Sequence, residues 1–164
     1  MKRHPPLLVA LHWLSAFLVI VTLISGGIAP LGFHMASGAL IFAIFLLRTT
    51  VKLKTHVPSS KGTQTQIARV MHMSLYGLVF AVVASGLGIA IEANLLEVFQ
   101  GNAMLPADLS ESPMYAAHAL LTDFLLAAIM VHTAAALWHQ VILRDRLFSR
   151  MWFGNKPEAD FPQN

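Results

Sequence analysis

Four long apolar segments dominate this 164-residue chain and leave few folds open to it. They run over residues 7–28, 34–51, 70–91 and 114–143. A helix that crosses a bilayer needs roughly 17 to 25 mostly apolar residues, and each segment reaches that length. Only 12% of the residues are charged, whereas soluble domains carry about 25%. The sequence therefore predicts an all-α integral membrane protein, built as a four-helix bundle.

We expect one transmembrane domain over residues 1–147, followed by a polar tail over 148–164 with an interfacial segment of its own. The first apolar segment is longer than the core of a signal peptide and lacks a cleavage site, so we interpret it as a retained helix. Helix breakers predict a tight turn over 26–32, and polar residues predict loops over 52–68 and 92–113. We find no convincing sequence repeat.

The basic residues predict how the chain sits in the membrane. With four spans, all 11 Lys and Arg fall on one side, and the loop before the last span instead holds Glu92, Glu97, Asp108 and Glu111. Cytoplasmic loops carry the excess of Lys and Arg, so both termini are expected in the cytoplasm. Because these charges lie only beside apolar segments, the net charge of +3 does not indicate nucleic-acid binding; lipid is the expected surrounding.

Histidine is the main chemical clue, because the chain has no Cys and so no thiolate ligand for haem or an iron–sulfur cluster. An ionisable residue inside a membrane is a functional candidate by default, although a single one can simply bond to a neighbouring helix. Six of the eight histidines lie in or at the ends of the spans: His12, His34, His72, His118, His132 and His139.

Depth in the membrane pairs four of these histidines. His34 opens the second span and His118 lies about one turn into the fourth, so both are near the non-cytoplasmic face. His132 follows His118 by 14 residues, which is roughly 21 Å along a helix and nearly the same helix face. His12 lies at the depth of His132. We therefore expect the pairs His34–His118 and His12–His132.

Two imidazoles fill both axial positions of a haem iron and leave none for oxygen, so such pairs favour electron transfer. A helical bundle can hold the porphyrin between facing side chains. Small residues either leave room for a porphyrin or let helices pack closely: Gly38, Ser85, Gly86, Gly88, Ala135 and Ala136.

The remaining candidates lie toward the cytoplasmic half. His139 can bond a haem propionate or a quinone carbonyl, and His72 can do either or replace His12 as a ligand. Both can equally be interfacial residues bonded to water or headgroups. Asp123, the acid well inside a span, either orients a ligand imidazole or bonds a neighbouring helix.

These residues resemble the bacterial cytochrome b561 family of four-helix di-haem membrane proteins, over nearly the whole chain. The segments that carry the resemblance are Leu11-His12-Trp13-Leu14, His34 with Gly38, His72 with Leu75-Tyr76, and His118 followed by residues 132–139 and Arg144-Asp145. The resemblance implies an inner-membrane location and two non-covalent haem b groups ligated by His12, His34, His118 and His132. It also implies ubiquinone as electron partner, with His139 near its site. One member type oxidises superoxide and passes the electron to ubiquinone.

The expected function is therefore that of a di-haem oxidoreductase exchanging electrons with ubiquinone, with superoxide as a substrate on the periplasmic side. Superoxide is an anion, and the non-cytoplasmic loops contain no Lys or Arg that would steer it. Two alternatives stay open. One is a haem-bearing anchor subunit that relays electrons for a separate dehydrogenase or redox protein. The other is a cofactor-free transporter or assembly factor that uses its histidines for protons or metals.

Overall fold

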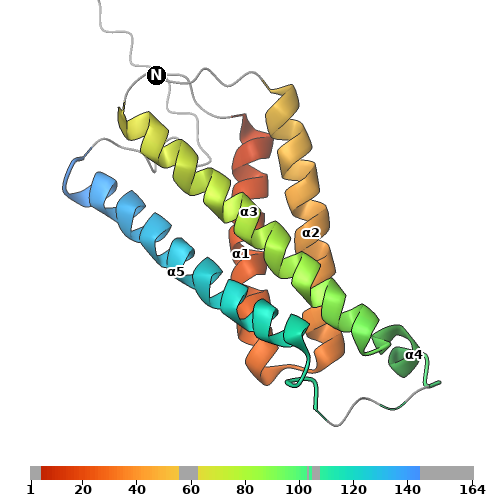
Figure 1. Cartoon of the computed structure of the whole chain (residues 1–164). Helices are drawn as coiled ribbons and strands as arrows, with labels where there is room; N and C mark the ends of the chain where they lie inside the picture. The colour runs from red at the N-terminus through yellow and green to blue at the C-terminus, as the bar shows by residue number, and fades with distance from the viewer. Residues whose placement is uncertain (1–4, 56–62, 103, 105–107, 145–164) are drawn as a thin grey trace, which may run out of the picture.

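The computed structural model describes residues 5–55, 63–102, 104 and 108–144. Those residues form helices and no strand, which confirms the predicted all-α class. The helices, in chain order, are α1 (Pro6–Ile28), α2 (Leu31–Lys54), α3 (Thr63–Glu92), α4 (Leu95–Phe99) and α5 (Pro113–Val141) (Figure 1). The predicted interfacial segment and the tail over 148–164 lie outside the described residues.

Four of these helices are long and apolar enough to cross a membrane, in agreement with the four predicted spans. Their bounds match the prediction closely, although α2 and α3 extend several residues further at the end that carries the basic residues. Large apolar side chains point outward around the bundle, and Phe17, Ile24, Phe124 and Met130 are all more than half exposed. Such a surface belongs in lipid, because a water-soluble monomer rarely exposes so large an apolar area.

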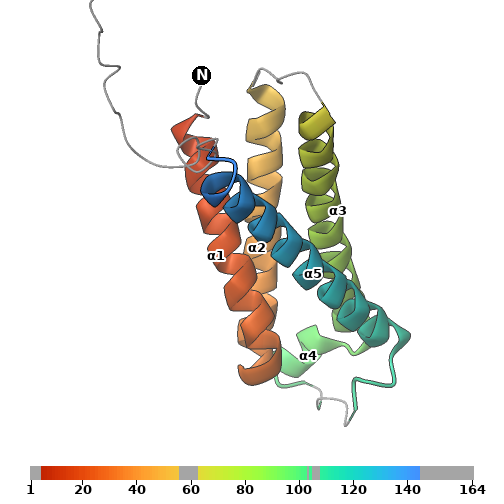
Figure 2. The ribbon, with the colours of Figure 1, turned by 90° about the vertical axis from the view of Figure 1, so that its left-hand side faces the viewer.

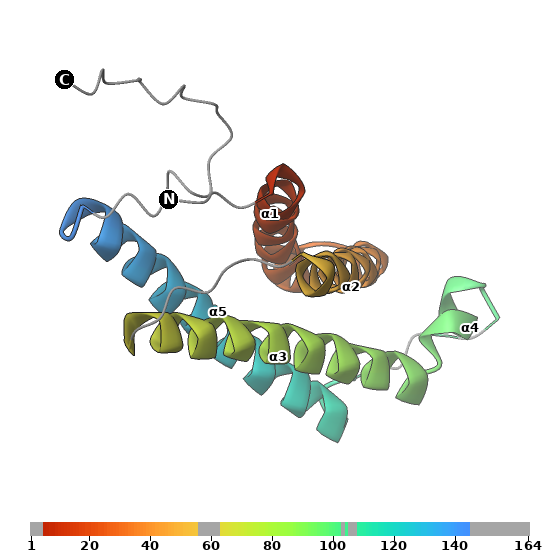
Figure 3. The same cartoon turned by 90° about the horizontal axis from the view of Figure 1, so that it is seen from above.

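The four spans are arranged as two helical hairpins. Seen from above, α1 lies beside α2, and α3 crosses close to α5 (Figure 3). The view from the side shows α5 crossing the bundle diagonally and α4 at the end opposite the start of α1 (Figure 2). A small buried cluster between the hairpins draws on all four helices: Leu18, Val19, Ile41, Phe45, Val79 and Leu125. Close packing rather than exclusion of water stabilises such contacts inside a bilayer.

The bundle has two chemically different ends. At the basic end lie the start of α1, the end of α2, the start of α3 and the end of α5, together with the described Lys and Arg residues. At the acidic end lie α4, the turn between α1 and α2, and the connection from α3 to α5 with its carboxylates.

The turn at the acidic end is tighter than the sequence predicted. Gly26 and Gly27 remain helical, and only Ala29 and Pro30 separate α1 from α2. Pro30 has a φ of −55°, close to the value its ring imposes, and its missing N–H costs nothing ahead of a helix. His34 consequently lies in the first turn of α2, directly beside the end of α1.

Candidate functional site

Two histidines from different hairpins meet near the acidic end. His34 on α2 and His118 on α5 have ring centroids 6.2 Å apart and ring planes at 89° to each other. The structure therefore brings together the pair expected from depth in the membrane.

The ring of His34 is held by the last turn of α1. Its Nδ1 lies 3.1 Å from Oγ of Ser25 and 3.2 Å from the carbonyl oxygen of Thr22. The Ser25 hydroxyl donates its own proton to that carbonyl at 2.9 Å, so both neighbours of Nδ1 are acceptors and Nδ1 carries the ring proton. A Cβ on Gly26 would lie 3.2 Å from Cε1 of the ring, so the glycine leaves the space that the imidazole needs.

The ring of His118 is held by α3 in the same way. Its Nδ1 lies 3.0 Å from Oγ of Ser85 and 3.0 Å from the carbonyl oxygen of Val82. The Ser85 hydroxyl donates to that carbonyl at 2.9 Å. A Cβ on Gly86 would lie 3.1 Å from Cε1 of His118. The bond to Ser85 orients this imidazole, whereas Asp123, which the sequence offered for that role, is exposed on α5.

This arrangement fits two axial ligands of one iron. Within the described residues, no hydrogen bond engages Nε2 of either ring, so its lone pair is available to a metal. Metal-ligating histidines usually donate their other N–H to a carbonyl or a similar acceptor. A first-row metal binds an imidazole nitrogen at about 2 Å and the nitrogen lies about 1.1 Å from the ring centre, so two opposite rings have centres about 6 Å apart.

A second pair of histidines meets nearer the basic end. His72 on α3 and His132 on α5 have ring centroids 5.2 Å apart, at 64°. Unlike the first pair, these two rings come from the same hairpin. Their separation is about 1 Å shorter than two opposite ligands of one metal require. His132 was paired with His12 from the sequence; that pairing stays a prediction, and His72 is the ring that contacts His132.

Two cationic side chains, Arg48 and Lys52, lie near the basic end of the bundle. Arg48 donates to Nδ1 of His12 at 2.9 Å. Since a guanidinium has no acceptor, His12 holds its proton on Nε2, the opposite tautomer to His34 and His118. Arg48 and Lys52 also lie over the ring of Tyr76, at 5.4 and 5.0 Å from its centroid. From the sequence, Arg48 was interpreted only as part of the basic residues that set the topology, although a charge inside an apolar span is itself a signal of a functional role.

The hydroxyl of Tyr76 is a further site feature that sequence reasoning missed. Its oxygen is buried and has no hydrogen-bond partner among the residues that the structure describes. A buried polar group without a partner costs about 1 to 3 kcal/mol, so this position suits a bound acceptor such as a carbonyl or carboxylate. His139, half-buried near the end of α5, lies at the same end of the bundle, and its proposed contact with quinone or propionate stays a prediction.

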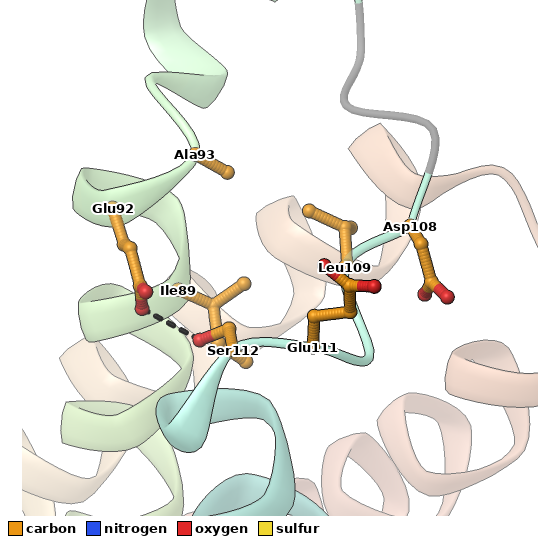
Figure 4. A pocket seen from close by; sticks show the side chains of 7 residues that line it. All are labelled: Ile89, Glu92, Ala93, Asp108, Leu109, Glu111 and Ser112. Carbon is orange, nitrogen blue, oxygen red and sulfur yellow. Dashed lines mark hydrogen bonds between the residues drawn. The ribbon is translucent and has the colours of Figure 1, made fainter.

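A pocket opens at the acidic end, one turn beyond Ser85 along α3 (Figure 4). Its lining residues are Ile89, Glu92, Ala93, Asp108, Leu109, Glu111 and Ser112. The Ser112 hydroxyl caps α5 and donates to Oε2 of Glu92 at 2.6 Å. Hydrogen bonds from Ser110 hold the pKa of Asp108 below its usual value, so the carboxylate is charged at neutral pH. Among the described residues, no group of three or more His, Cys, Asp or Glu is placed to hold a bare metal ion.

Comparison with known proteins identifies the family of the chain. Residues 3–154 match the family model described as prokaryotic cytochrome b561. The chain is also similar to a protein of Yersinia pestis named probable superoxide oxidase CybB. The two are 27% identical over 169 residues, which cover 92% of this chain and 96% of that protein. No solved structure matches. The matched residues include both histidine pairs, His34 with His118 and His72 with His132.

Proposed function

This chain belongs to the prokaryotic cytochrome b561 family, and from that premise we propose that it is a di-haem oxidoreductase exchanging electrons with ubiquinone. The family makes it a bacterial membrane protein that binds haem b and transfers electrons. We further propose that each chain binds two haems, that it lies in the inner membrane, and that its basic end faces the cytoplasm. The observation that carries it is the spacing of His34 and His118, 6.2 Å between ring centroids, with Nδ1 of each ring already bonded.

At the acidic end, His34 and His118 would hold one haem iron from opposite sides. When bound, the haem would supply a one-electron couple. The chain contributes the rest: two hairpins hold the imidazoles at the required distance, the carbonyls of Thr22 and Val82 keep the proton on Nδ1, and Ser25 and Ser85 help to orient the rings. Because two imidazoles would hold the iron, the haem would serve electron transfer rather than the binding of oxygen.

At the basic end, His132 would ligate the second iron. His12 is the partner that the family resemblance implies, and it must exchange its bond with Arg48 for the other tautomer to present a lone pair at Nε2. His72 is the competing partner, because its ring already contacts that of His132. The Tyr76 hydroxyl and the Arg48 and Lys52 cations suit a ubiquinone carbonyl or a haem propionate at the same level.

Superoxide is the electron donor that the named relative supports, and we include its oxidation at the acidic end in the proposal. The carboxylates Glu92, Asp108 and Glu111 oppose the approach of an anion. The same carboxylates favour a second candidate, in which a cationic redox protein docks there and the chain relays its electrons as a haem-bearing subunit without its own small substrate.

A spectroscopic experiment tests the proposal. Protein purified after expression with ample haem should give a haem b spectrum with about two haems per chain. Ubiquinol should reduce it anaerobically, and superoxide should do so from the acidic side. The variants His12→Ala and His72→Ala identify the second ligand of the basic-end haem. Only the variant that removes this ligand should lose about one haem per chain. His56→Ala, in the predicted loop, is the control. A preparation without a Soret band would overturn the function, and haem that neither quinol nor superoxide reduces would favour the relay candidate.

A further inference from the structure

The two hairpins place polar residues at the same intervals, and all but one pair of these residues are identical. Ser25-Gly26 follows His12 by 13 residues on α1, and Ser85-Gly86 follows His72 by 13 residues on α3. On the partner helices, Arg48 follows His34 by 14 residues and His132 follows His118 by 14. The sequence alone did not show this repeat, because few other positions are identical.

Burial follows the repeat as well. The same alignment of α1 with α3 places Val19 on Val79, which are 7% and 4% exposed. The alignment of α2 with α5 places Ile41 on Leu125, each 4% exposed. All four belong to the cluster between the hairpins. At these two pairs of positions the environments are therefore equivalent, and they lie in the same alignment as the recurrence of Ser-Gly beside a histidine.

We propose that Ser25 and Ser85 are equivalent positioning residues, each of which orients one histidine ligand at the acidic end beside a main-chain carbonyl that keeps the ring proton on Nδ1. Each hydroxyl donates its proton to the carbonyl three residues earlier and so offers only lone pairs to Nδ1. The following glycine admits the ring. Nδ1 then keeps its proton, and Nε2 would offer its lone pair to the haem iron.

The two serines also set the electron density on the ligands. An imidazole that donates Nδ1–H to an acceptor is a stronger donor to iron, and losing such a partner typically lowers metal affinity by about 10- to 100-fold. Stronger donation favours the ferric state. Removing either hydroxyl should therefore raise the reduction potential of the acidic-end haem, although the backbone carbonyl of Thr22 or Val82 still accepts from Nδ1.

The inference rests on the proposed function for the identity of the metal group, and the test uses the haem-loaded protein. Ser25→Ala, Ser85→Ala and the double variant are compared by redox titration of the haem spectrum and by the low-spin electron paramagnetic resonance signals. Ser15→Ala is the matched control. Ser15 is also buried on α1 and also donates to a main-chain carbonyl, that of Leu11 at 2.6 Å, but its hydroxyl bonds no imidazole in the described structure.

Each single variant should shift the same haem component to higher potential and change its resonance signal, and the double variant should shift it further. Haem retention in detergent should fall by about tenfold for the double variant. Unchanged signals, an equal shift in Ser15→Ala, or shifts in different haem components would overturn the inference. Those outcomes leave the di-haem function standing, whereas a protein that binds no haem at all would remove that function.

Discussion

At the acidic end, His34 and His118 each donate Nδ1–H to a neighbouring helix, whereas at the basic end His12 accepts a hydrogen bond from Arg48. The first pair joins two hairpins and is spaced for a shared metal. The second contact, between His72 and His132, lies within one hairpin and is 1.0 Å closer. The internal repeat is thus kept at one end and altered at the other, where Arg48 takes the place equivalent to His132.

This difference gives the bundle an electrical direction. With the two proposed haems in place, the cations Arg48 and Lys52 would stabilise the reduced state of the basic-end haem and raise its potential. The acceptors on the acidic-end ligands would lower the potential of the other haem. Electrons that enter at the acidic end would therefore move downhill toward the basic end, where ubiquinone is proposed to bind.

The largest effect should come from removing ligands. His34→Ala and His118→Ala should each lose about one haem per chain, and the double variant should lose no more, because both serve one iron. His34→Ala combined with His132→Ala should lose both. Haem quantification per protein checks this. If the His34→Ala, His118→Ala double variant loses two haems, the shared site is wrong.

Glycine variants should have the next largest effect and should act only at the acidic end. A Cβ at residue 26 or 86 would press on the ring of His34 or His118, and overpacking of this kind costs about 1 to 3 kcal/mol. Gly26→Ala and Gly86→Ala should therefore lower haem affinity by roughly tenfold or more. Gly77→Ala is the matched control, because a Cβ there meets nothing within 4 Å. Equal loss in the control would argue for general helix packing instead.

At the basic end, Arg48→Gln should lower the reduction potential of that haem by an amount on the order of 1 kcal/mol, because a nearby positive charge is removed. The acidic-end component should keep its potential. A redox titration that resolves the two components tests this electrical difference. A shift confined to the acidic-end haem would reverse our assignment of the two components.

Tyr76→Phe removes the buried hydroxyl that has no partner in the described structure. If that hydroxyl donates to ubiquinone, the variant should raise KM for ubiquinol several-fold, as the loss of one hydrogen bond of about 1 kcal/mol predicts. Haem content should not change. Tyr115→Phe, on α5 at the acidic end, is the control, and an equal rise in KM there would remove the basic end as the quinone site.

The smallest effect concerns the acidic pocket. Asp108→Asn with Glu111→Gln should speed reduction by superoxide a few-fold at low salt, because two charges that repel the anion are removed. The gain should shrink above about 0.1 M salt, where the Debye length is about 10 Å. Glu92 is left unchanged so that its bond to Ser112 still joins α3 to α5. Slower reduction by a cationic protein in the same variant would support the relay candidate.

The four membrane spans could be predicted directly from the sequence, because the length and apolar content of a segment determine whether it can cross a bilayer. The same count of residues placed His34 and His118 at one depth. The sequence could not show that Gly26 continues a helix, since glycine before a proline also fits a turn. Nor could it show that Ser85 bonds an imidazole, because a small residue in a membrane helix equally allows close packing. The contact between Arg48 and His12 depends on tertiary packing that no local pattern encodes.

The division into two hairpins has a consequence for biogenesis. Each hairpin can insert into the bilayer as a unit, yet neither supplies both imidazoles of the acidic-end pair. A porphyrin held there would link the two hairpins, and it would do so only after both had inserted. In cells starved of haem, the two hairpins should therefore associate only loosely. When the gene is divided between α2 and α3, the two fragments should reassemble in vivo only if haem is supplied.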